Sequence, residues 1–212
     1  MKLQPHDRIL FQGDSITHAY RVEDPNEPHD CYLLGAGYAG RVAGRLQAEH
    51  PAMGLRFWNR GVCGNNIPAL LERWNLDTIC LEPDVLSLLI GVNDAFPACE
   101  QTADQYEQQY RRLLEMTRAG MPHVRLILLE PFALFHGMVT QQHMQRVRDR
   151  QPRVRRIADD YDATFVPLQE LFDTAVSDHP DVPPTHWTLD GVHPSAAGHH
   201  LIAQAWLNAT QT

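Results

Sequence analysis

The chain has 212 residues, a length that suits one well-buried domain and is short for two, so we expect a single domain over 1–212. Its 18 basic against 26 acidic side chains give a formal net charge of −8, which argues against a nucleic-acid-binding protein. Hydrophobic content of 43% and charged content of 21% are ordinary for a globular protein.

Neither a secretory signal nor a membrane span is expected from the sequence. The first residues lack a basic segment followed by an apolar core, and no window approaches about eighteen consecutive apolar residues. The four cysteines are well separated and form no C-x-x-C pair. We therefore expect reduced thiols in a cytoplasmic protein that does not act on membranes.

Short apolar runs alternate with longer helical patterns along the chain. The runs are nearly continuous in apolar character, as expected of strands buried on both faces of a parallel sheet, and cover 8–12, 55–60, 84–90, 124–130 and 164–168. The helical patterns cover 35–50, 65–80, 101–120, 141–160 and 195–208. This order predicts an α/β fold, a three-layer α/β/α sandwich around a five-stranded parallel sheet.

Polar, glycine-containing segments follow the first three runs and precede the last helix. They read GDSIT at 13–17, NRGVCGNN at 59–66, GVND at 91–94 and LDGVHPS at 189–195. Functional groups of such a fold gather beyond the carboxyl ends of its strands, so these segments are the candidates for a site.

Together the four segments supply what acyl transfer requires. The hydroxyl of Ser15 becomes a nucleophile once a base takes its proton, and His193 is the candidate base. Asp190 is the candidate that orients the imidazole. The backbone N–H groups of Ser15 and Gly64 and the side-chain amide of Asn93 are candidate oxyanion donors. On local sequence alone, Ser15 could instead cap the following helix.

The same segments resemble the conserved blocks of the SGNH (GDSL-type) hydrolase family. GDS at 13–15 resembles the first block, N-x-G-x-x-G at 59–64 the second, G-x-N-D at 91–94 the third and D-x-x-H-P at 190–194 the last. One block alone is a weak signal, but four occur here in the family's order across most of the chain. Isoleucine follows GDS where leucine is common in the family.

The resemblance implies a flavodoxin-like sandwich and a serine esterase. In the family the serine of the first block is the nucleophile, which corresponds to Ser15, and the last block supplies the base and its orienting acid, His193 and Asp190. The oxyanion hole would consist of Ser15, Gly64 and Asn93. No cofactor and no metal are implied.

Within that family the chain is most similar to intracellular acetylxylan esterases, through GAGYAGRV at 35–42, the segment 190–206 and the overall length. This implies a homo-oligomeric carbohydrate acetylesterase acting on a small-molecule or oligosaccharide ester, such as acetylated xylo-oligosaccharides. Two alternatives stay open: a lysophospholipase or thioesterase of the same family, and a flavodoxin-like ligand-binding module.

Several other features carry weaker predictions. Four aromatic residues near predicted strand ends or the Asp190 loop are candidates for a substrate pocket or for the core: Phe96, Phe132, Phe135 and Trp187. The C-terminal histidines match no metal-ligand spacing. Six arginines between 146 and 156 predict a solvated helix face or contacts to acidic residues of another subunit, with an anionic polymer or lipid surface as the alternative. Pro152 is expected to break or kink that helix.

Overall fold

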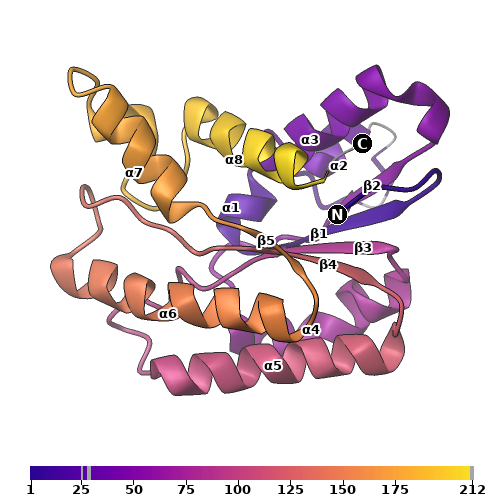
Figure 1. Cartoon of the computed structure of the whole chain (residues 1–212), viewed down its shortest axis with the longest axis horizontal. Coiled ribbons are helices and arrows are strands. Elements are labelled where there is room, and N and C mark those ends of the chain that lie inside the picture. The colour runs from indigo at the N-terminus through magenta and orange to yellow at the C-terminus, as the bar shows by residue number, and fades with distance from the viewer. Residues whose placement is uncertain (25, 28–29, 211–212) are drawn as a thin grey trace.

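The computed structural model describes residues 1–24, 26–27 and 30–210. Five strands form one parallel sheet in the order β2-β1-β3-β4-β5 (Figure 1). They are β1 Arg8–Gly13, β2 Arg56–Asn59, β3 Val85–Leu89, β4 Arg125–Leu129 and β5 Thr164–Val166. The predicted five-stranded parallel sheet is confirmed, and its order is that of flavodoxin-like folds.

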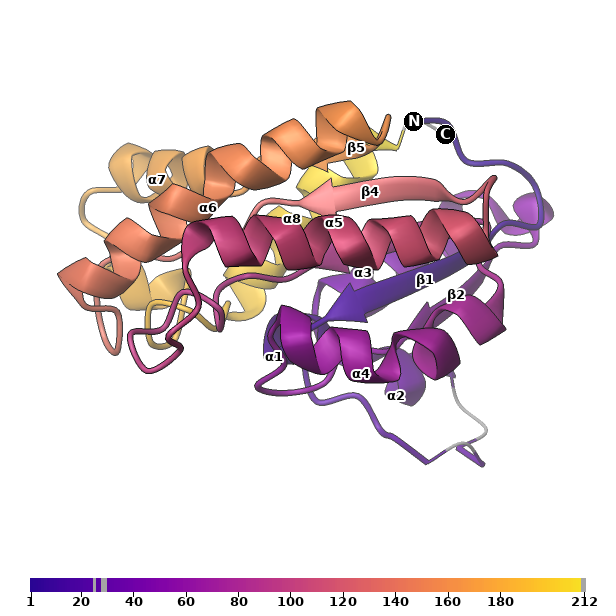
Figure 2. The ribbon, with the colours of Figure 1, turned by 90° about the horizontal axis from the view of Figure 1, so that it is seen from below.

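Helices cover both faces of the sheet (Figures 1 and 2). One face carries α1 Ser15–His18, α2 Asp30–Leu34, α3 Tyr38–Glu49, α7 Gln169–Asp178 and α8 Ala196–Ala209. The other carries α4 Ile67–Asp77, α5 Ala103–Gly120 and α6 Gln141–Asp160. Single 3₁₀ turns lie at Pro51–Met53, Ile79–Leu81 and Pro184–His186. Within the described residues no helix is long and apolar enough to cross a bilayer.

The strands are apolar on both sides because each side packs under a helix layer. On β1, Ile9 and Phe11 belong to the hydrophobic cluster beneath α3 and α8, whereas Leu10 belongs to the cluster beneath α4 and α5. All three side chains are fully buried. This two-sided burial explains why the runs in the sequence are continuous and do not alternate with polar residues.

Helix α6 continues through Pro152, so of the predicted break or kink the break is wrong. The helix is fixed on both sides of the proline. Before it, the buried Arg150 donates to backbone carbonyls of the loop after β3. After it, Arg153 and Arg156 donate to Glu107 on α5. The arginine cluster is therefore not a fully solvated face, because Arg150, Arg153 and Arg156 contact residues of their own chain.

The sheet has its topological switch point between β1 and β3. The chain crosses from β1 to β2 on one side and returns to β3 on the other, so the loops after β1 and β3 diverge at this edge. Gly13, which ends β1, pairs with Leu89 at the end of β3. A Cβ at Gly13 would collide with the Leu89 carbonyl, and its φ is 155°, so glycine alone fits where the loops begin.

Candidate active site

Ser15 is the first residue of α1, directly beyond the end of β1. Asp14 caps this helix, since its side chain accepts the N–H of Ile16 at 2.9 Å. Ser15 is thus not the cap that local sequence allowed. Its hydroxyl points instead to His193, with 2.9 Å between Ser15 Oγ and His193 Nε2.

The imidazole of His193 lies between the serine and a carboxylate. His193 Nδ1 is 2.7 Å from Asp190 Oδ2. The other oxygen, Asp190 Oδ1, accepts the backbone N–H groups of Val192 at 3.0 Å and His193 at 2.8 Å. With a proton on Nδ1 facing the carboxylate, Nε2 has a free lone pair for the serine hydroxyl proton.

The pKa of Asp190 supports a carboxylate that stays ionised. Partial burial alone would raise it, but the hydrogen bonds from the backbone and ring of His193 and from the N–H of Val192 outweigh burial, so the pKa lies below its usual range. An ionised Asp190 stabilises the positive charge that His193 acquires when it takes a proton.

Two further carboxyl groups lie buried beneath the site. Burial, with a smaller contribution from the nearby charge of Asp94, raises the pKa of Asp14 to about 7 despite the hydrogen bond from Ile16. Burial also raises the pKa of Asp94 to about 6. Asp94 Oδ1 accepts the N–H of Ile67 at 3.0 Å, at the start of α4. Asp14 and Asp94 therefore hold the starts of α1 and α4, the helices that follow the loops of the site.

The predicted oxyanion donors come from adjacent loops. Gly64 is exposed and adopts a φ of 77°, a left-handed conformation that favours glycine, and a Cβ there would meet no atom within 4 Å. The side-chain amide of Asn93 donates to the Asn65 carbonyl at 2.8 Å, which brings the loop after β3 against the loop after β2. The second hydrogen of that amide is available to a substrate oxygen.

Two arginines that the sequence did not single out for the site hold these loops. Arg73 on α4 donates to Asn65 Oδ1 at 2.7 Å, to the Arg60 carbonyl at 2.9 Å and to the Gly13 carbonyl at 3.3 Å. Arg150 on α6 donates to the carbonyl of Asp94, the residue after Asn93, at 2.8 Å. Neither belongs to a local motif: Arg150 reaches its loop from a helix distant in the sequence, and Arg73 reaches back from the helix that follows the loop after β2.

A pocket of about 290 Å³ opens beside Ser15. Besides Ser15 it is lined by residues 16 and 18–20 from the segment after β1, by residues 189, 190, 193 and 194 from the segment before α8, and by Cys63 and His199. Burial lowers the pKa of His199 to about 4, so its imidazole is neutral at pH 7. The neutral ring accepts the backbone N–H of Tyr38 at Nδ1.

The four predicted pocket aromatics, all of them in described segments, are not among the residues that line this pocket. Phe132 is fully buried and stacks on Phe172 in the core, and Phe96 stacks on His143. Trp187 is 9% exposed and packs edge-on to a neighbouring histidine, while Phe135 is 68% exposed. Core packing, the other interpretation open from the sequence, accounts for Phe132 and Trp187, and Phe96 packs against the same cluster.

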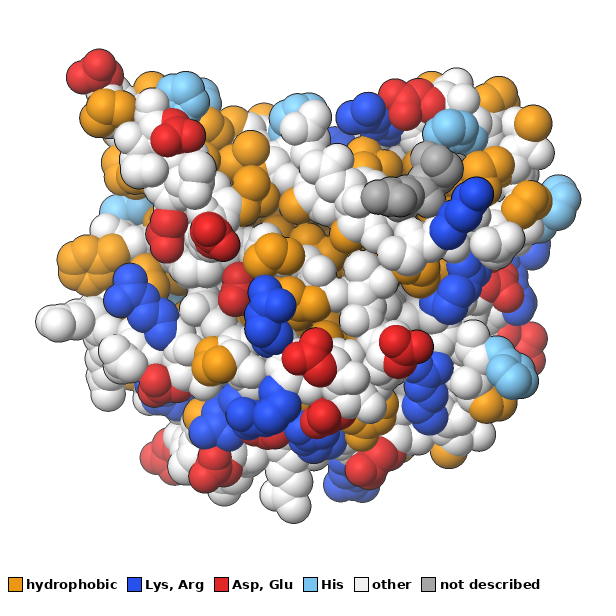
Figure 3. Space-filling model, in the orientation of Figure 1, with side chains coloured by type: hydrophobic (Ala, Val, Ile, Leu, Met, Phe, Trp, Pro, Cys, Tyr) orange, Lys and Arg blue, Asp and Glu red, His pale blue; other side chains and the backbone are white. Residues whose placement is uncertain are grey.

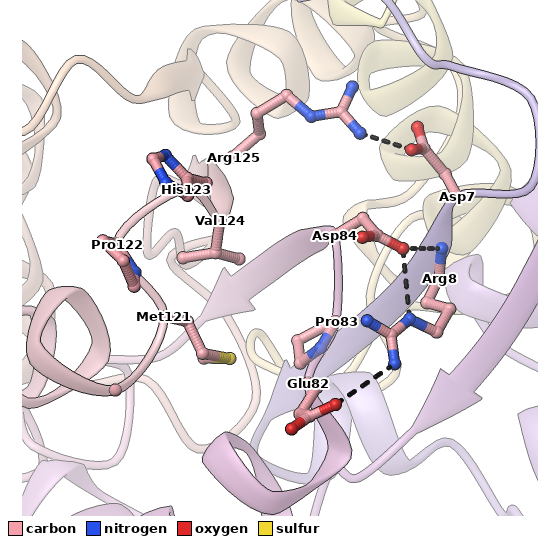
Figure 4. Close-up of a pocket in the computed structure, with 11 residues that line it drawn as sticks. Asp7, Arg8, Glu82, Pro83, Asp84, Met121, Pro122, His123, Val124 and Arg125 are labelled. Atoms are coloured by element: carbon pink, nitrogen blue, oxygen red, sulfur yellow. Dashed lines mark hydrogen bonds and ion pairs between the residues drawn. The ribbon is translucent and has the colours of Figure 1, made fainter.

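Another pocket, of about 350 Å³, lies at the opposite edge of the sheet, where β1, β3 and β4 begin (Figure 4). Its charged side chains pair with one another: Arg8 with Glu82 and Asp84, and Arg125 with Asp7. These pairs join the starts of the strands, far from the carboxyl ends that carry Ser15. In the part of the chain that the structure describes, no group of three or more His, Cys, Asp or Glu side chains could hold a metal ion.

A hydroxyl, an imidazole and a carboxylate hydrogen-bonded in a row, at the switch point of a flavodoxin-like sheet, are the arrangement of a serine hydrolase. Residues 11–201 match the model of the GDSL-like Lipase/Acylhydrolase family, and the chain belongs to this family. It is a carboxylic ester hydrolase, and the resemblance seen in the four sequence blocks is confirmed.

Similar proteins include characterised acetylxylan esterases. An acetylxylan esterase of Geobacillus stearothermophilus is 35% identical over 217 residues, which cover 98% of this chain and 95% of the relative. The crystal structure of Axe2, an acetylxylan esterase from that organism, matches with a TM-score of 0.86 at 32% identity, covering 99% of this chain and 96% of Axe2. A putative GDSL-like lipase from Parabacteroides merdae ATCC 43184 matches with a TM-score of 0.92 at 34% identity, covering 99% and 97% of the two chains.

Proposed function

We propose that the protein is a carbohydrate acetylesterase that removes acetyl groups from acetylated xylo-oligosaccharides or similar sugars. The observation that carries this proposal is the hydrogen-bonded row of Ser15, His193 and Asp190 beside a pocket of about 290 Å³. That volume lies at the lower end of ligand pockets, which span roughly 300–1,000 Å³. The similarity to acetylxylan esterases along nearly the whole chain supports the same substrate class.

In the proposed first step, Ser15 Oγ attacks the acetyl carbonyl carbon while His193 Nε2 takes the hydroxyl proton. Asp190 keeps the imidazolium oriented and stabilised. The carbonyl oxygen becomes an oxyanion that accepts hydrogen bonds from the N–H groups of Ser15 and Gly64 and from the amide of Asn93. One such donor typically contributes about 3–4 kcal/mol to transition-state stabilisation.

Collapse of this intermediate breaks the bond to the sugar oxygen, which takes the proton from His193 Nε2. Acetyl-Ser15 remains. A water molecule then attacks the acetyl carbon as His193 takes one of its protons, and the second collapse returns that proton to Ser15 Oγ and releases acetic acid, which ionises to acetate in solution. The balanced reaction consumes one water molecule and requires no cofactor.

Fluorophosphonate labelling tests the nucleophile. We expect intact-mass analysis to show one adduct on the wild type and none on Ser15→Ala. Ser177→Ala, which changes an exposed serine on α7, is the matched control and should label fully. An active wild type that takes no adduct, or a labelled and fully active Ser15→Ala, would overturn the mechanism.

Acyl-chain length separates an acetylesterase from other members of the family. We expect the acetyl ester of a given alcohol to be hydrolysed faster than its octanoyl ester. The reverse order would overturn the acetyl preference and favour a lysophospholipase or thioesterase.

We also propose that residues 1–212 form a single domain that acts in the cytoplasm as a homo-oligomer. The four cysteines are free thiols, three of them exposed, which supports a reducing compartment.

A groove between α7 and α8 has apolar side chains that include Val166, Leu171, Leu201 and Ala205, and hydrophobic atoms show between these helices in Figure 3. Such a groove supports an interface between copies. Light scattering coupled to size-exclusion chromatography would refute the assembly by showing a monomer of 24.1 kDa.

A further inference from the structure

The pocket beside Ser15 lies on the side where the alcohol must leave. Its described lining includes Ser15 and His193 but neither Gly64 nor Asn93, the other proposed oxyanion donors. In the proposed mechanism the leaving oxygen takes its proton from His193 Nε2, so the alcohol must lie within hydrogen-bond reach of that nitrogen. The pocket therefore receives the sugar, while the acetyl group faces the oxyanion donors.

Two exposed side chains line this pocket, one from the segment after β1 and the other from the segment before α8. Tyr20, just after α1, is 87% exposed, and Leu189, just before Asp190, is 60% exposed. A tyrosine normally packs part of its large apolar ring against the protein. Here the ring is presented to solvent within a few residues of the nucleophile.

The backbone that presents Tyr20 is strained and firmly held. Ala19 and Tyr20 have φ values of 40° and 61°, two consecutive left-handed residues that both carry a Cβ. Such conformations persist where surrounding contacts enforce them. The N–H of Tyr20 donates to His18 Nδ1 at 3.2 Å, the N–H of Arg21 donates to the His18 carbonyl at 2.9 Å, and the N–H of Ala36 donates to the Ala19 carbonyl at 2.9 Å.

The glycines of the GAGYAGRV stretch complete this support. A Cβ at Gly35 would lie 2.7 Å from the Ala19 carbonyl and 2.8 Å from the His18 carbonyl. A Cβ at Gly37 would collide with the Cβ of Ala19. Because both positions are glycine, residues 35–37 can lie directly against the turn that carries Tyr20. The GAGYAGRV stretch, to which the proposed mechanism assigns no role, therefore shapes the part of the pocket lining that carries Tyr20.

We propose that Tyr20 determines specificity in the alcohol subsite by stacking its ring on the apolar C–H face of the acetylated sugar, with Leu189 contacting the sugar from the segment before α8. This inference rests on the proposed function and names the part of the substrate that the pocket recognises. A sugar ring has a C–H face and a polar hydroxyl edge, so a preformed aromatic face beside polar groups matches it. An aromatic side chain with two rotatable bonds gives a large contact at a low entropic cost.

The test compares Tyr20→Ala and Tyr20→Phe on acetylated xylobiose and on methyl acetate, which has no sugar ring. Phe135→Ala is the matched control, because Phe135 is another exposed aromatic, 68% exposed, that does not line the pocket. Tyr20→Ala keeps the Cβ and so leaves the backbone strain unchanged, and a thermal melt should match the wild type.

We expect Tyr20→Ala to lower kcat/KM for acetylated xylobiose about tenfold, chiefly through a higher KM, and to leave methyl acetate within about twofold. Tyr20→Phe and Phe135→Ala should keep wild-type values on both esters. If the wild type prefers the acetylated sugar and Tyr20→Ala keeps that preference, the role of Tyr20 is overturned while the proposed function stands. If Tyr20→Phe loses as much kcat/KM on the acetylated sugar as Tyr20→Ala does, the Tyr20 hydroxyl and not the ring face recognises the sugar, which also overturns stacking. A wild type with no preference for the sugar overturns both proposals.

Discussion

The exchange Asp190→Asn tests the orientation of His193, because the structure dictates how an asparagine must sit. Asp190 Oδ1 accepts two backbone N–H groups, at 3.0 and 2.8 Å, whereas Oδ2 faces His193 Nδ1. In the variant the amide oxygen has to take the place of Oδ1, since the amide nitrogen can only donate. The NH₂ group then faces Nδ1, so the imidazole proton moves to Nε2 and points at Ser15. His193 can no longer accept the serine proton.

The expected loss of kcat in Asp190→Asn is large, whereas the stability of the fold should hardly change. In the well-studied Ser-His-Asp proteases this exchange lowers kcat about 10⁴-fold, which equals roughly 5.5 kcal/mol at about 1.36 kcal/mol for each factor of ten. The amide oxygen keeps both loop hydrogen bonds, so the melting temperature should stay within about 2 °C of the wild type. Asp190→Ala removes the acceptor of both N–H groups, which costs about 2 kcal/mol and lowers the melting temperature by about 4–8 °C.

Initial rates on an acetyl ester, combined with thermal melts of the same preparations, separate the two effects. Asp181→Asn is the matched control, because it changes an exposed aspartate of the preceding loop and should alter neither quantity. An asparagine variant at position 190 with kcat within tenfold of the wild type would refute the orientation argument. Equal melting temperatures for the asparagine and alanine variants would refute the loop argument alone.

Two further predictions concern the arginines of α6. Partial burial would raise the pKa of Glu107, but hydrogen bonds from three arginines outweigh it and lower the pKa from 4.5 to about 2. Glu107 therefore stabilises the fold above about pH 4.5, and this contribution disappears as the pH falls towards 2. Glu107→Gln should lower the free energy of unfolding by about 1–2 kcal/mol at pH 7, allowing for solvent screening, and by roughly half of that or less at pH 3. Urea unfolding that shows equal losses at the two pH values would contradict this. Arg150→Met should lower the free energy of unfolding by about 2–4 kcal/mol and reduce kcat more than it raises KM, because Arg150 holds the loop that follows Asn93. Arg148→Met, which changes an exposed arginine of the same helix, is the control. An unchanged kcat in Arg150→Met would show that the loop keeps its shape without the guanidinium.

The sheet could be predicted from the sequence because its signal is local. In β3, Val85 and Leu89 face one helix layer and Leu86 and Leu88 the other, and every residue of the strand is buried. A continuous apolar run of this length between glycine- and proline-containing loops indicates such a strand. The reacting groups could be predicted equally well, because each lies in a short sequence block: Ser15 follows β1, and Asp190 and His193 precede α8.

Elements fixed by distant residues could not be predicted in this way. Helix α7 begins where the N–H groups of Leu168 and Gln169 donate to Glu130, a carboxylate at the end of β4. No capping residue precedes α7 in its own sequence to mark this start. Pro152 shows the opposite case: a local helix breaker is tolerated because the contacts of Arg150 and Arg153 fix the helix on both sides.

The residues that support the site fall into two groups, and the loss of each group should change a different kinetic constant. Loops beyond the strand ends leave backbone carbonyls without sheet partners, and buried carbonyls need donors. Arg73 supplies a donor for Arg60 and a second one for Gly13, beside the N–H of Val62, and Arg150 supplies one for Asp94. These loops carry the proposed oxyanion donors, which act mainly in the transition state, so losing either guanidinium should lower kcat. In the proposed subsite Tyr20 contacts the sugar in the ground state as well as in the transition state, so its loss should raise KM.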